Sequence, residues 1–284
     1  MNGRAIFLLA ACAAVTAAAT PDALRLRGEV TLAGPPGDPA VALALRDLSD
    51  DFHRVLGQPT RRVDGTNAAI AKQLSADKPG VRAEAAKALA ARNAVDQVGS
   101  LLSTAEDKEP AVAAEVFKAI RVIAKAEHVP ALVKLLVSAA DGGVRGEAEN
   151  AVVAAAATTE AGKNPAEPVL AALPGAASPQ VRASLLRVLG RIAHASALPI
   201  LYQSAQDADA EVKDAAIRAL AEWPTGEPVQ VLLGIAGDAS ASPIHRVLAL
   251  RGYVVMIPKQ PDATDDQILD NYAKAMQLAG RNET

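Results

Sequence analysis

Aromatic residues are scarce in this 284-residue chain: Phe, Trp and Tyr together make up only 2% of it, although 50% of the residues are hydrophobic. The apolar mass therefore consists mostly of Ala, Val and Leu. Such small side chains let helices approach closely, so the composition favours packed helices over a β-sandwich. The scarcity also disfavours base stacking on nucleic acid and sugar binding through exposed aromatic rings.

Positive charge and cysteine are equally limited. The 29 basic residues are outnumbered by 32 acidic ones, whereas nucleic-acid binding usually requires a basic domain. The single cysteine, Cys12, excludes an internal disulfide framework and any multi-cysteine metal site. No zinc spacing, nucleophile elbow, P-loop or dinucleotide fingerprint is present, and no two histidines lie three to five residues apart; these are His53, His128, His194 and His245. We therefore predict no catalytic residue, metal, cofactor or nucleic-acid partner, and favour a non-enzyme.

The first twenty residues predict export. One positive charge, Arg4, precedes a short apolar run and then small residues, which is typical of a signal peptide, and the run is too short to span a bilayer. Cleavage after Ala19 would make residues 1–19 the signal and leave a mature chain without cysteine, which suits an oxidising compartment. Alternatively, LAAC (Leu9 to Cys12) resembles the bacterial lipobox, in which the signal extends to residue 11 and Cys12 is lipidated. Both alternatives predict a periplasmic, cell-envelope or extracellular protein, and the only predicted contact with a membrane is a lipid anchor at Cys12. The third alternative is that the first residues are not processed.

Beyond residue 65 the chain is repetitive. Six segments combine a turn with Val or Ile and then an Ala- or Leu-rich stretch, as in SPQVRASLLRVLGRI (Ser178 to Ile192). Their anchor residues, separated by 31, 32, 37, 31 and 32 residues, are Val81, Val112, Val144, Val181, Val212 and Ile244. A sustained period of this length is typical of solenoid proteins, in which each unit packs on its neighbours.

Each unit is predicted to be a pair of helices. A second column precedes the later anchors and consists of Asp96, Pro130, Pro168, Pro199 and Pro228. Proline is tolerated in the first turn of a helix but not in its interior, so these residues indicate where the first helices begin. Apolar residues at helical spacing after each anchor form one stripe. The predicted fold class is all-α, an α-solenoid of about six helix pairs over residues 66–260.

Paired helices of this period, with Pro in the first helix and D-x-x-V-R-x-x-A opening the second, resemble HEAT repeats. The resemblance is narrower to the short bacterial type, the PBS-lyase-type repeats. It implies a superhelix whose second helices line the concave face. It also implies that the protein binds other proteins.

The flanks of the array are predicted separately. Residues 20–65 form a short α/β or capping segment, with an alternating strand pattern near Leu24 and a helix that begins after Asp38. Residues 264–280 form an amphipathic helix, either a terminal cap or the first helix of a seventh unit of a longer design. The extra residues behind the gap of 37 lie in Thr158 to Pro168, which predicts a surface loop.

Charged residues recur at the start of the second helices. Arginine follows the anchor in three units and lysine in a fourth, and an acid lies in several preceding turns. The resemblance to HEAT proteins implies an Asp–Arg ladder that ties neighbouring units together. Its predicted members are Asp77, Arg82, Asp141, Arg145, Arg182, Asp209 and Lys213.

The sixth residue after each anchor forms a second, largely basic column: Lys87, Lys118, Asn150, Arg187, Arg218 and Leu250. A Glu three residues earlier neutralises the lysines of the first units, but Ser184 and Ala215 stand there in the fourth and fifth. The least compensated cations are therefore predicted to be Arg187 and Arg218, with Arg191 nearby. We hypothesise that Lys87, Lys118, Arg187, Arg191 and Arg218 bind an acidic partner or an anionic polymer; the alternative is a solvated surface.

The last repeat is unusually apolar because Val247 and Leu250 replace the expected polar residues. Such a patch is typical of a contact surface, or of a surface buried by the terminal helix. The favoured function is an exported HEAT-repeat scaffold that mediates protein–protein interaction through its concave face. Two alternatives stay open: an accessory module of an exported carbohydrate-degrading system, and a HEAT-like lyase. The sequence does not identify the partner.

Overall fold

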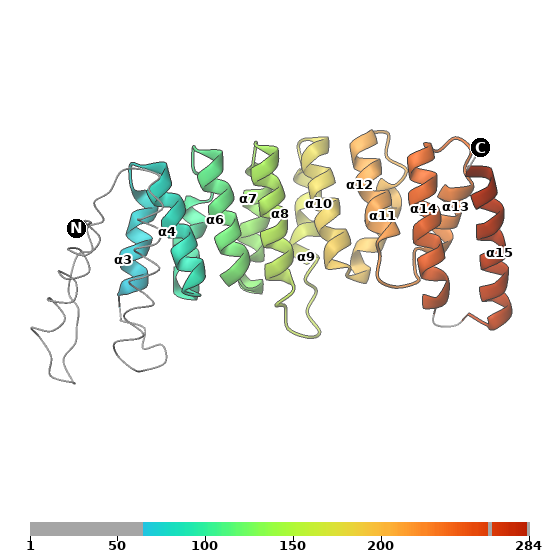
Figure 1. Ribbon diagram of the computed structural model, residues 1–284, viewed down its shortest axis with the longest axis horizontal. Helices are drawn as coiled ribbons and strands as arrows, with labels where there is room; N and C mark the ends of the chain where they lie inside the picture. Colours follow the sequence, from blue (N-terminus) through green and yellow to red (C-terminus); the bar gives the residue numbers. More distant parts are fainter. Residues whose placement is uncertain (1–64, 261–262, 283–284) are drawn as a thin grey trace, which may run out of the picture.

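The computed structural model describes residues 65–260 and 263–282, and every regular element in these ranges is a helix (Figure 1). This confirms the predicted all-α fold. The predicted export signal with Cys12, and the strand and helix between residues 20 and 64, lie outside the described residues. Within the described ranges, no helix combines the length and hydropathy needed to cross a membrane.

Six helix pairs follow one another along the chain. The pairs are α3 (Thr66–Lys72) with α4 (Pro79–Ala91), α5 (Val98–Thr104) with α6 (Pro110–Ile123), α7 (Val129–Ser138) with α8 (Gly142–Ala156), α9 (Glu167–Ala172) with α10 (Pro179–Ile192), α11 (Leu198–Ser204) with α12 (Ala210–Ala221), and α13 (Val229–Gly237) with α14 (Pro243–Met256). The first helices are shorter than the second ones, and short 3-10 turns precede or extend several of them. A further helix, α15 (Asp265–Asn282), packs on α14.

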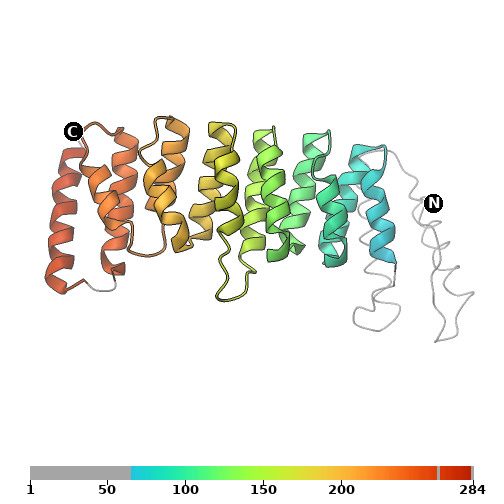
Figure 2. The ribbon, with the colours of Figure 1, turned by 180° about the vertical axis from the view of Figure 1, so that it is seen from behind.

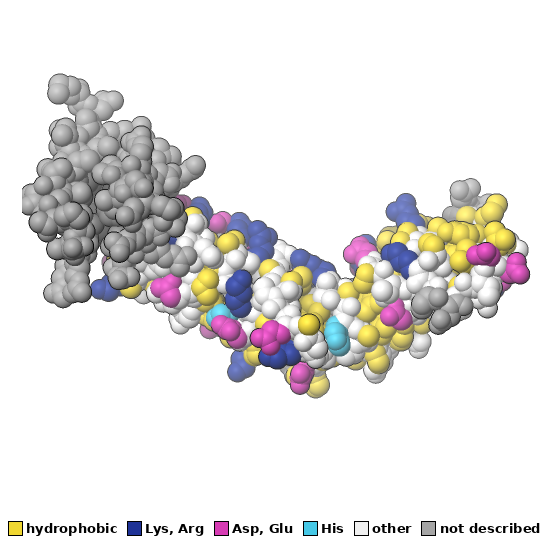
Figure 3. All heavy atoms as spheres, turned by 90° about the horizontal axis from the view of Figure 1, so that it is seen from below, with side chains coloured by type: hydrophobic (Ala, Val, Ile, Leu, Met, Phe, Trp, Pro, Cys, Tyr) yellow, Lys and Arg dark blue, Asp and Glu magenta, His cyan; other side chains and the backbone are white. Residues whose placement is uncertain are grey.

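The helices form two layers. The second helices α4, α6, α8, α10, α12 and α14 contact one another in sequence and lie nearer the viewer in Figure 1, whereas the first helices lie nearer in Figure 2. Figure 3 shows that the array bends into an arc whose hollow side is formed by the second-helix layer. The second helices therefore line the concave face.

Local sequence signals position the ends of these helices. Proline occupies the first turn of α7, α9 and α11, as predicted, and also that of α4, α6, α10 and α14. Side chains also cap second helices: Asp141 accepts a hydrogen bond from Val144 N at the start of α8, and Ser178 accepts one from Val181 N at the start of α10. The predicted insertion is a loop between α8 and α9, which projects below the array in Figure 1.

The core runs the length of the array between the two layers. The eleventh residue of every second helix is buried; these residues are Leu89, Ile120, Val152, Leu189, Leu220 and Tyr253. Burial at this position therefore recurs with the repeat. Three aromatic rings belong to this core, because Phe117, Trp223 and Tyr253 are all at most 2% exposed.

Small residues set the spacing of the second helices near the C-terminal end. A Cβ added at Gly190 of α10 would lie 2.5 Å from Ala219 Cβ of α12, and one added at Gly252 of α14 would lie 2.7 Å from Ala221 Cα. Both contacts join the twelfth residue of one second helix to the tenth residue of the next. The backbones can approach this closely only because neither glycine carries a side chain.

The close approach predicts opposite effects for two kinds of glycine. Gly190→Ala should lower the free energy of unfolding by about 1–2 kcal/mol, because the overpacking cost exceeds the helix propensity that alanine gains. Gly146→Ala in α8 is the matched control, since an added Cβ there meets nothing within 4 Å, and it should stabilise by about 0.5–1 kcal/mol. Chemical denaturation of both variants measures the difference; equal effects would contradict the packing.

Candidate functional site

The ninth residue of each second helix lies on the concave face and forms what we call the basic column. Counting from the helix starts, its members are Lys87, Lys118, Asn150, Arg187, Arg218 and Arg251. The last member corrects the sequence alignment, which placed Leu250 here and Ile244 at the anchor. Ser242 caps α14 through His245 N just as Ser178 caps α10 through Val181 N, so the anchor of the sixth unit is His245.

This correction could have been made from the sequence. The dipeptide Ser-Pro opens both α10 and α14, at Ser178 and Ser242, and is a stronger alignment signal than an apolar residue two positions later. Aligned on it, Arg251 joins the column. Leu250 joins the eighth position, where Phe117, Leu186 and Ile217 are buried.

The first two lysines of the column are neutralised within their own helices, as predicted. Lys87 Nζ lies 2.9 Å from Glu84 Oε1, and Lys118 Nζ lies 2.8 Å from Glu115 Oε1. The hydrogen bond from each lysine to its glutamate is the main cause that raises its pKa. Both lysine side chains are about half exposed, so these ion pairs lie on the surface and contribute little to the stability of the fold.

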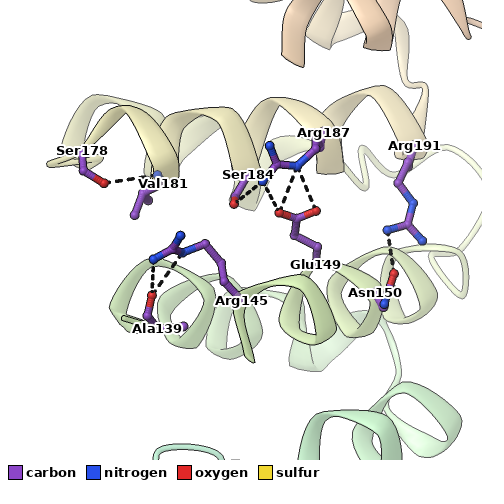
Figure 4. Close-up of polar contacts among 9 residues, drawn as sticks. All are labelled: Ala139, Arg145, Glu149, Asn150, Ser178, Val181, Ser184, Arg187 and Arg191. Carbon is purple, nitrogen blue, oxygen red and sulfur yellow. Dashed lines mark hydrogen bonds and ion pairs between the residues drawn. The ribbon is translucent and has the colours of Figure 1, made fainter. Parts of the chain in front are cut away.

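Arg187 is not an uncompensated cation, contrary to the expectation from its own helix. Its guanidinium binds both carboxylate oxygens of Glu149 in α8, with Arg187 Nη2 2.7 Å from Glu149 Oε1, and also donates to Ser184 Oγ (Figure 4). Glu149 is only 7% exposed and stands in the otherwise apolar eighth position. The pair therefore joins two units and is part of the structure as well as of the surface.

The cations beside Arg187 have partners of different strength. Arg191 Nη1 donates to Asn150 Oδ1 at 2.9 Å, a contact with a neutral group (Figure 4). Arg218 Nε lies 2.7 Å from Asp214 Oδ2, which corrects the expectation that nothing neutralises it. Asp214 also lies 3.1 Å from His245 Nε2 of the next unit. Burial raises the pKa of Asp214, but its hydrogen bonds with Arg218 and His245 outweigh burial and lower it.

Arg251 is different from the other members of the column. Its side chain is exposed, and among residues 65–260 and 263–282 it makes no ion pair or side-chain hydrogen bond. Dark-blue Lys and Arg side chains appear along the hollow edge on both sides of its middle in Figure 3. The concave face therefore carries paired charges toward α4 and a cation with free hydrogen-bond donors on α14.

The predicted ladder exists in two places, with different acids from those expected. Arg82 binds Asp107 of the next unit through two hydrogen bonds, of 2.6 and 2.8 Å, and Arg182 Nη2 lies 2.8 Å from Asp207. Each acid follows its arginine by 25 residues. The hydrogen bond from Arg82 is the main cause that lowers the pKa of Asp107, and the backbone N–H of Asp209 is the main cause that lowers the pKa of Asp207.

The other predicted ladder residues have local roles. Asp141 and Asp209 accept hydrogen bonds from the backbone at the starts of α8 and α12, and Asp77 contributes its backbone oxygen to Arg82. Arg145 donates to the carbonyl oxygens of Ala139 and Ala140 within its own turn. For Lys213, no described side chain forms an ion pair with it.

The described histidines do not assemble into a metal site. His128, His194 and His245 lie in separate units, and nowhere in the described ranges do three or more His, Cys, Asp or Glu side chains gather as metal ligands would. One open polar hollow of about 780 Å³ lies between the start of α13 and α15. Its charged lining residues include Glu227, Lys259, Asp270 and Lys274, of which the last two pair with each other.

Comparison with known proteins agrees with this architecture. The family model described as HEAT repeats matches residues 67–153 and 166–251. The gap between the two matches contains most of the loop between α8 and α9. No curated protein sequence matches the chain.

Two solved structures are similar to this chain at low identity. One is from the complex of CpcE and CpcF of phycocyanin lyase from Nostoc sp. PCC7120, with 17% identity and a TM-score of 0.41 over 78% of this chain and 97% of that one. The other is human deoxyhypusine hydroxylase in complex with glycerol, with 16% identity and a TM-score of 0.30 over 87% of this chain and 93% of that one. Likenesses at this level assign no function to the chain.

The Glu149–Arg187 pair predicts a coupled effect on stability. Arg187→Leu should lower the free energy of unfolding by about 1–3 kcal/mol, because it leaves a buried carboxylate without its cation. The double variant Glu149→Leu/Arg187→Leu should recover most of this loss, since apolar residues occupy the eighth position of α6, α10 and α12. Arg191→Leu, with a neutral partner, is the control and should change stability by less than about 0.5 kcal/mol. Additive effects in a double-mutant cycle would contradict the coupling.

The lowered pKa of Asp107 predicts a pH-dependent contribution of the Arg82–Asp107 contact. A carboxylate with a depressed folded-state pKa stabilises fully above its unfolded value, near 3.9, and loses this contribution as the pH falls through the folded value. Asp107→Asn should therefore lower Tm by about 5 °C at neutral pH, and the gap to the wild type should close below a pH of about 4. Calorimetry measures Tm for each variant. Asp77→Asn, which changes an exposed carboxylate in the preceding turn, is the control and should have the same Tm as the wild type.

Proposed function

Because this chain belongs to the HEAT-repeat family, we propose that it is an exported scaffold protein that binds a protein partner through its concave face. The observation that carries this proposal is the basic column. At their ninth position, the second helices of all the units carry Lys or Arg, except α8, which has Asn150 there. A row of evenly spaced cations on a concave surface is suited to an acidic surface on another protein, because charge complementarity steers and orients association.

The absence of an ion pair at Arg251 favours the C-terminal half of the array as the main contact with the partner. Arg251 and the half-exposed Arg218 lie on neighbouring helices, and Arg191 contributes donors that a neutral amide only partly satisfies. Arginine binds carboxylates with two parallel hydrogen bonds, so these three residues suit Asp or Glu side chains of the partner. Arg187, which the sequence also nominated, is held by Glu149 and would contribute less.

Export is part of the same proposal and is supported by the first twenty residues. The signal-peptide pattern around Arg4 and the lipobox-like LAAC ending at Cys12 both predict a protein outside the cytoplasm. N-terminal sequencing of the processed protein distinguishes cleavage after Ala19 from a lipid-modified Cys12. A mature chain that still begins at Met1 would contradict export.

The binding site is tested by neutralising the column without introducing repulsion inside the array. The triple variant Lys118→Gln/Arg218→Gln/Arg251→Gln removes three exposed cations and leaves the Glu149–Arg187 pair intact. Affinity capture from the native cell envelope, followed by titration of the captured protein, should show about tenfold weaker binding at low salt, because each exposed pair contributes roughly 0.2–1 kcal/mol. The difference should shrink as salt is added.

The control has the same charge change at residues outside the basic column. Lys72, Lys134 and Lys163 lie on α3, α7 and the loop before α9, and all three side chains are exposed. Lys72→Gln/Lys134→Gln/Lys163→Gln should bind like the wild type. Equal weakening by both triple variants would assign the effect to net charge and contradict a site on the concave face.

A further inference from the structure

Exposed large apolar side chains are concentrated at one end of the array. Of the nine in the described ranges, only Val95 and Val122 lie elsewhere; the other seven belong to α14 and α15 and are Ile244, Val247, Val254, Val255, Leu269, Tyr272 and Met276. Figure 3 shows the corresponding yellow patch at the C-terminal end of the arc, on its hollow side. Solenoid proteins normally close their terminal repeats with a polar outer face, so this patch needs a physical reason.

The repeat shows which side of each second helix contacts the following one. Asp214, the fifth residue of α12, meets His245, the third of α14. Glu149, the eighth residue of α8, meets Arg187, the ninth of α10. The twelfth residue meets the tenth at the two close approaches between α10, α12 and α14. The fifth, eighth and twelfth residues therefore form the forward side of each second helix.

In α14 the forward side is apolar and uncovered. Its fifth, eighth and twelfth residues are Val247, Leu250 and Val254, of which Val247 and Val254 are each 37% exposed. No described second helix packs beyond α14, and α15 is the one described helix that follows and packs on it. The forward side of α14 is thus an apolar surface on which one more helix can pack, as successive second helices pack on each other from α4 to α14.

The outer side of α15 completes this surface. Asn271 and Ala275 are buried toward the array, and Tyr253 Oη of α14 donates to the carbonyl oxygen of Asn271 at 3.3 Å. On the opposite side, the exposed fractions of Leu269, Tyr272 and Met276 are 67%, 37% and 77%. Their spacing of three and four residues makes one apolar stripe along the helix.

We propose that this surface is a dimer interface, in which α15 of a second copy lies antiparallel to α15 across a two-fold axis near Tyr272. The direction of the helix favours this occupant. Second helices run parallel to one another, and α15 runs antiparallel to α14. A helix that covers the forward side of α14 as a further second helix must therefore run antiparallel to α15. A two-fold axis perpendicular to α15 gives the partner's α15 this direction and makes the contact self-complementary, as closed symmetric dimers require.

The register also fits a second copy. In an antiparallel pairing centred on Tyr272 and its neighbour, Leu269 lies opposite Met276 of the partner subunit, so the two ends of the stripe cover each other. Asp270 and Lys274 pair with each other within α15 at 2.6 Å and line the hollow toward α13, away from this stripe, so they do not take part in the contact. The basic column on the concave face is not used, so the interface is independent of the proposed partner site.

The register is tested by charge exchange in the full-length protein. Sedimentation equilibrium should give twice the monomer mass for the wild type. Leu269→Glu and Met276→Lys should each be monomeric, because a dimer of either variant would bury two charges, one from each copy, against apolar side chains. An equimolar mixture of the two variants should recover dimers, since Glu at 269 of one chain then lies opposite Lys at 276 of the other. Circular dichroism checks that both variants keep the helix content of the wild type, as expected for exposed positions.

Val122→Glu is the matched control, because Val122 is an isolated exposed valine on α6, 59% exposed, and this variant should remain dimeric. A monomeric wild type would overturn the proposal and leave the surface to another protein's helix. Dimers that survive in both single variants would overturn it too. Loss of dimer without recovery in the mixture would contradict the antiparallel register.

Discussion

The close packing of the second helices is the constraint on which the rest of this structure depends. Each second helix touches only its two neighbours in the row, and Gly190 and Gly252 let the backbones meet the alanines of α12 almost directly. This contact fixes the register of one helix against the next. Once the register is fixed, the same positions are buried, forward-facing or concave in every unit.

Polar contacts add specificity to this row. Glu149 occupies a position that is apolar in most other second helices, and it is tolerated because Arg187 of the next unit satisfies it. The Arg82–Asp107 contact performs a related task at the turns and joins the first unit to the second. The charges of the concave face are therefore of two kinds: those that hold units together, and those, such as Arg251, that form no ion pair with any described side chain.

The ends of the row have opposite characters in the described part of the chain. Exposed large apolar side chains collect on α14 and α15, whereas α3 and α4 carry none. Each unit of a solenoid packs on the next through the same kind of interface. The repeat therefore sets the shape and direction of the surface that is exposed at an uncovered end. The proposed binding along the arc and the proposed association at its end therefore use separate surfaces of one row of helices.

The sequence by itself determined the all-α solenoid, the pairing of helices and the loop before α9, because proline positions and apolar spacing report local structure directly. It also identified the cations of the concave face, except that an apolar anchor at Ile244 shifted the last unit by one residue and hid Arg251. Only the tertiary structure decided which of those cations are free. Arg187 meets Glu149 38 residues earlier, and Arg82 meets Asp107 in the next unit. Contacts between units depend on the stacking register, which no local pattern specifies.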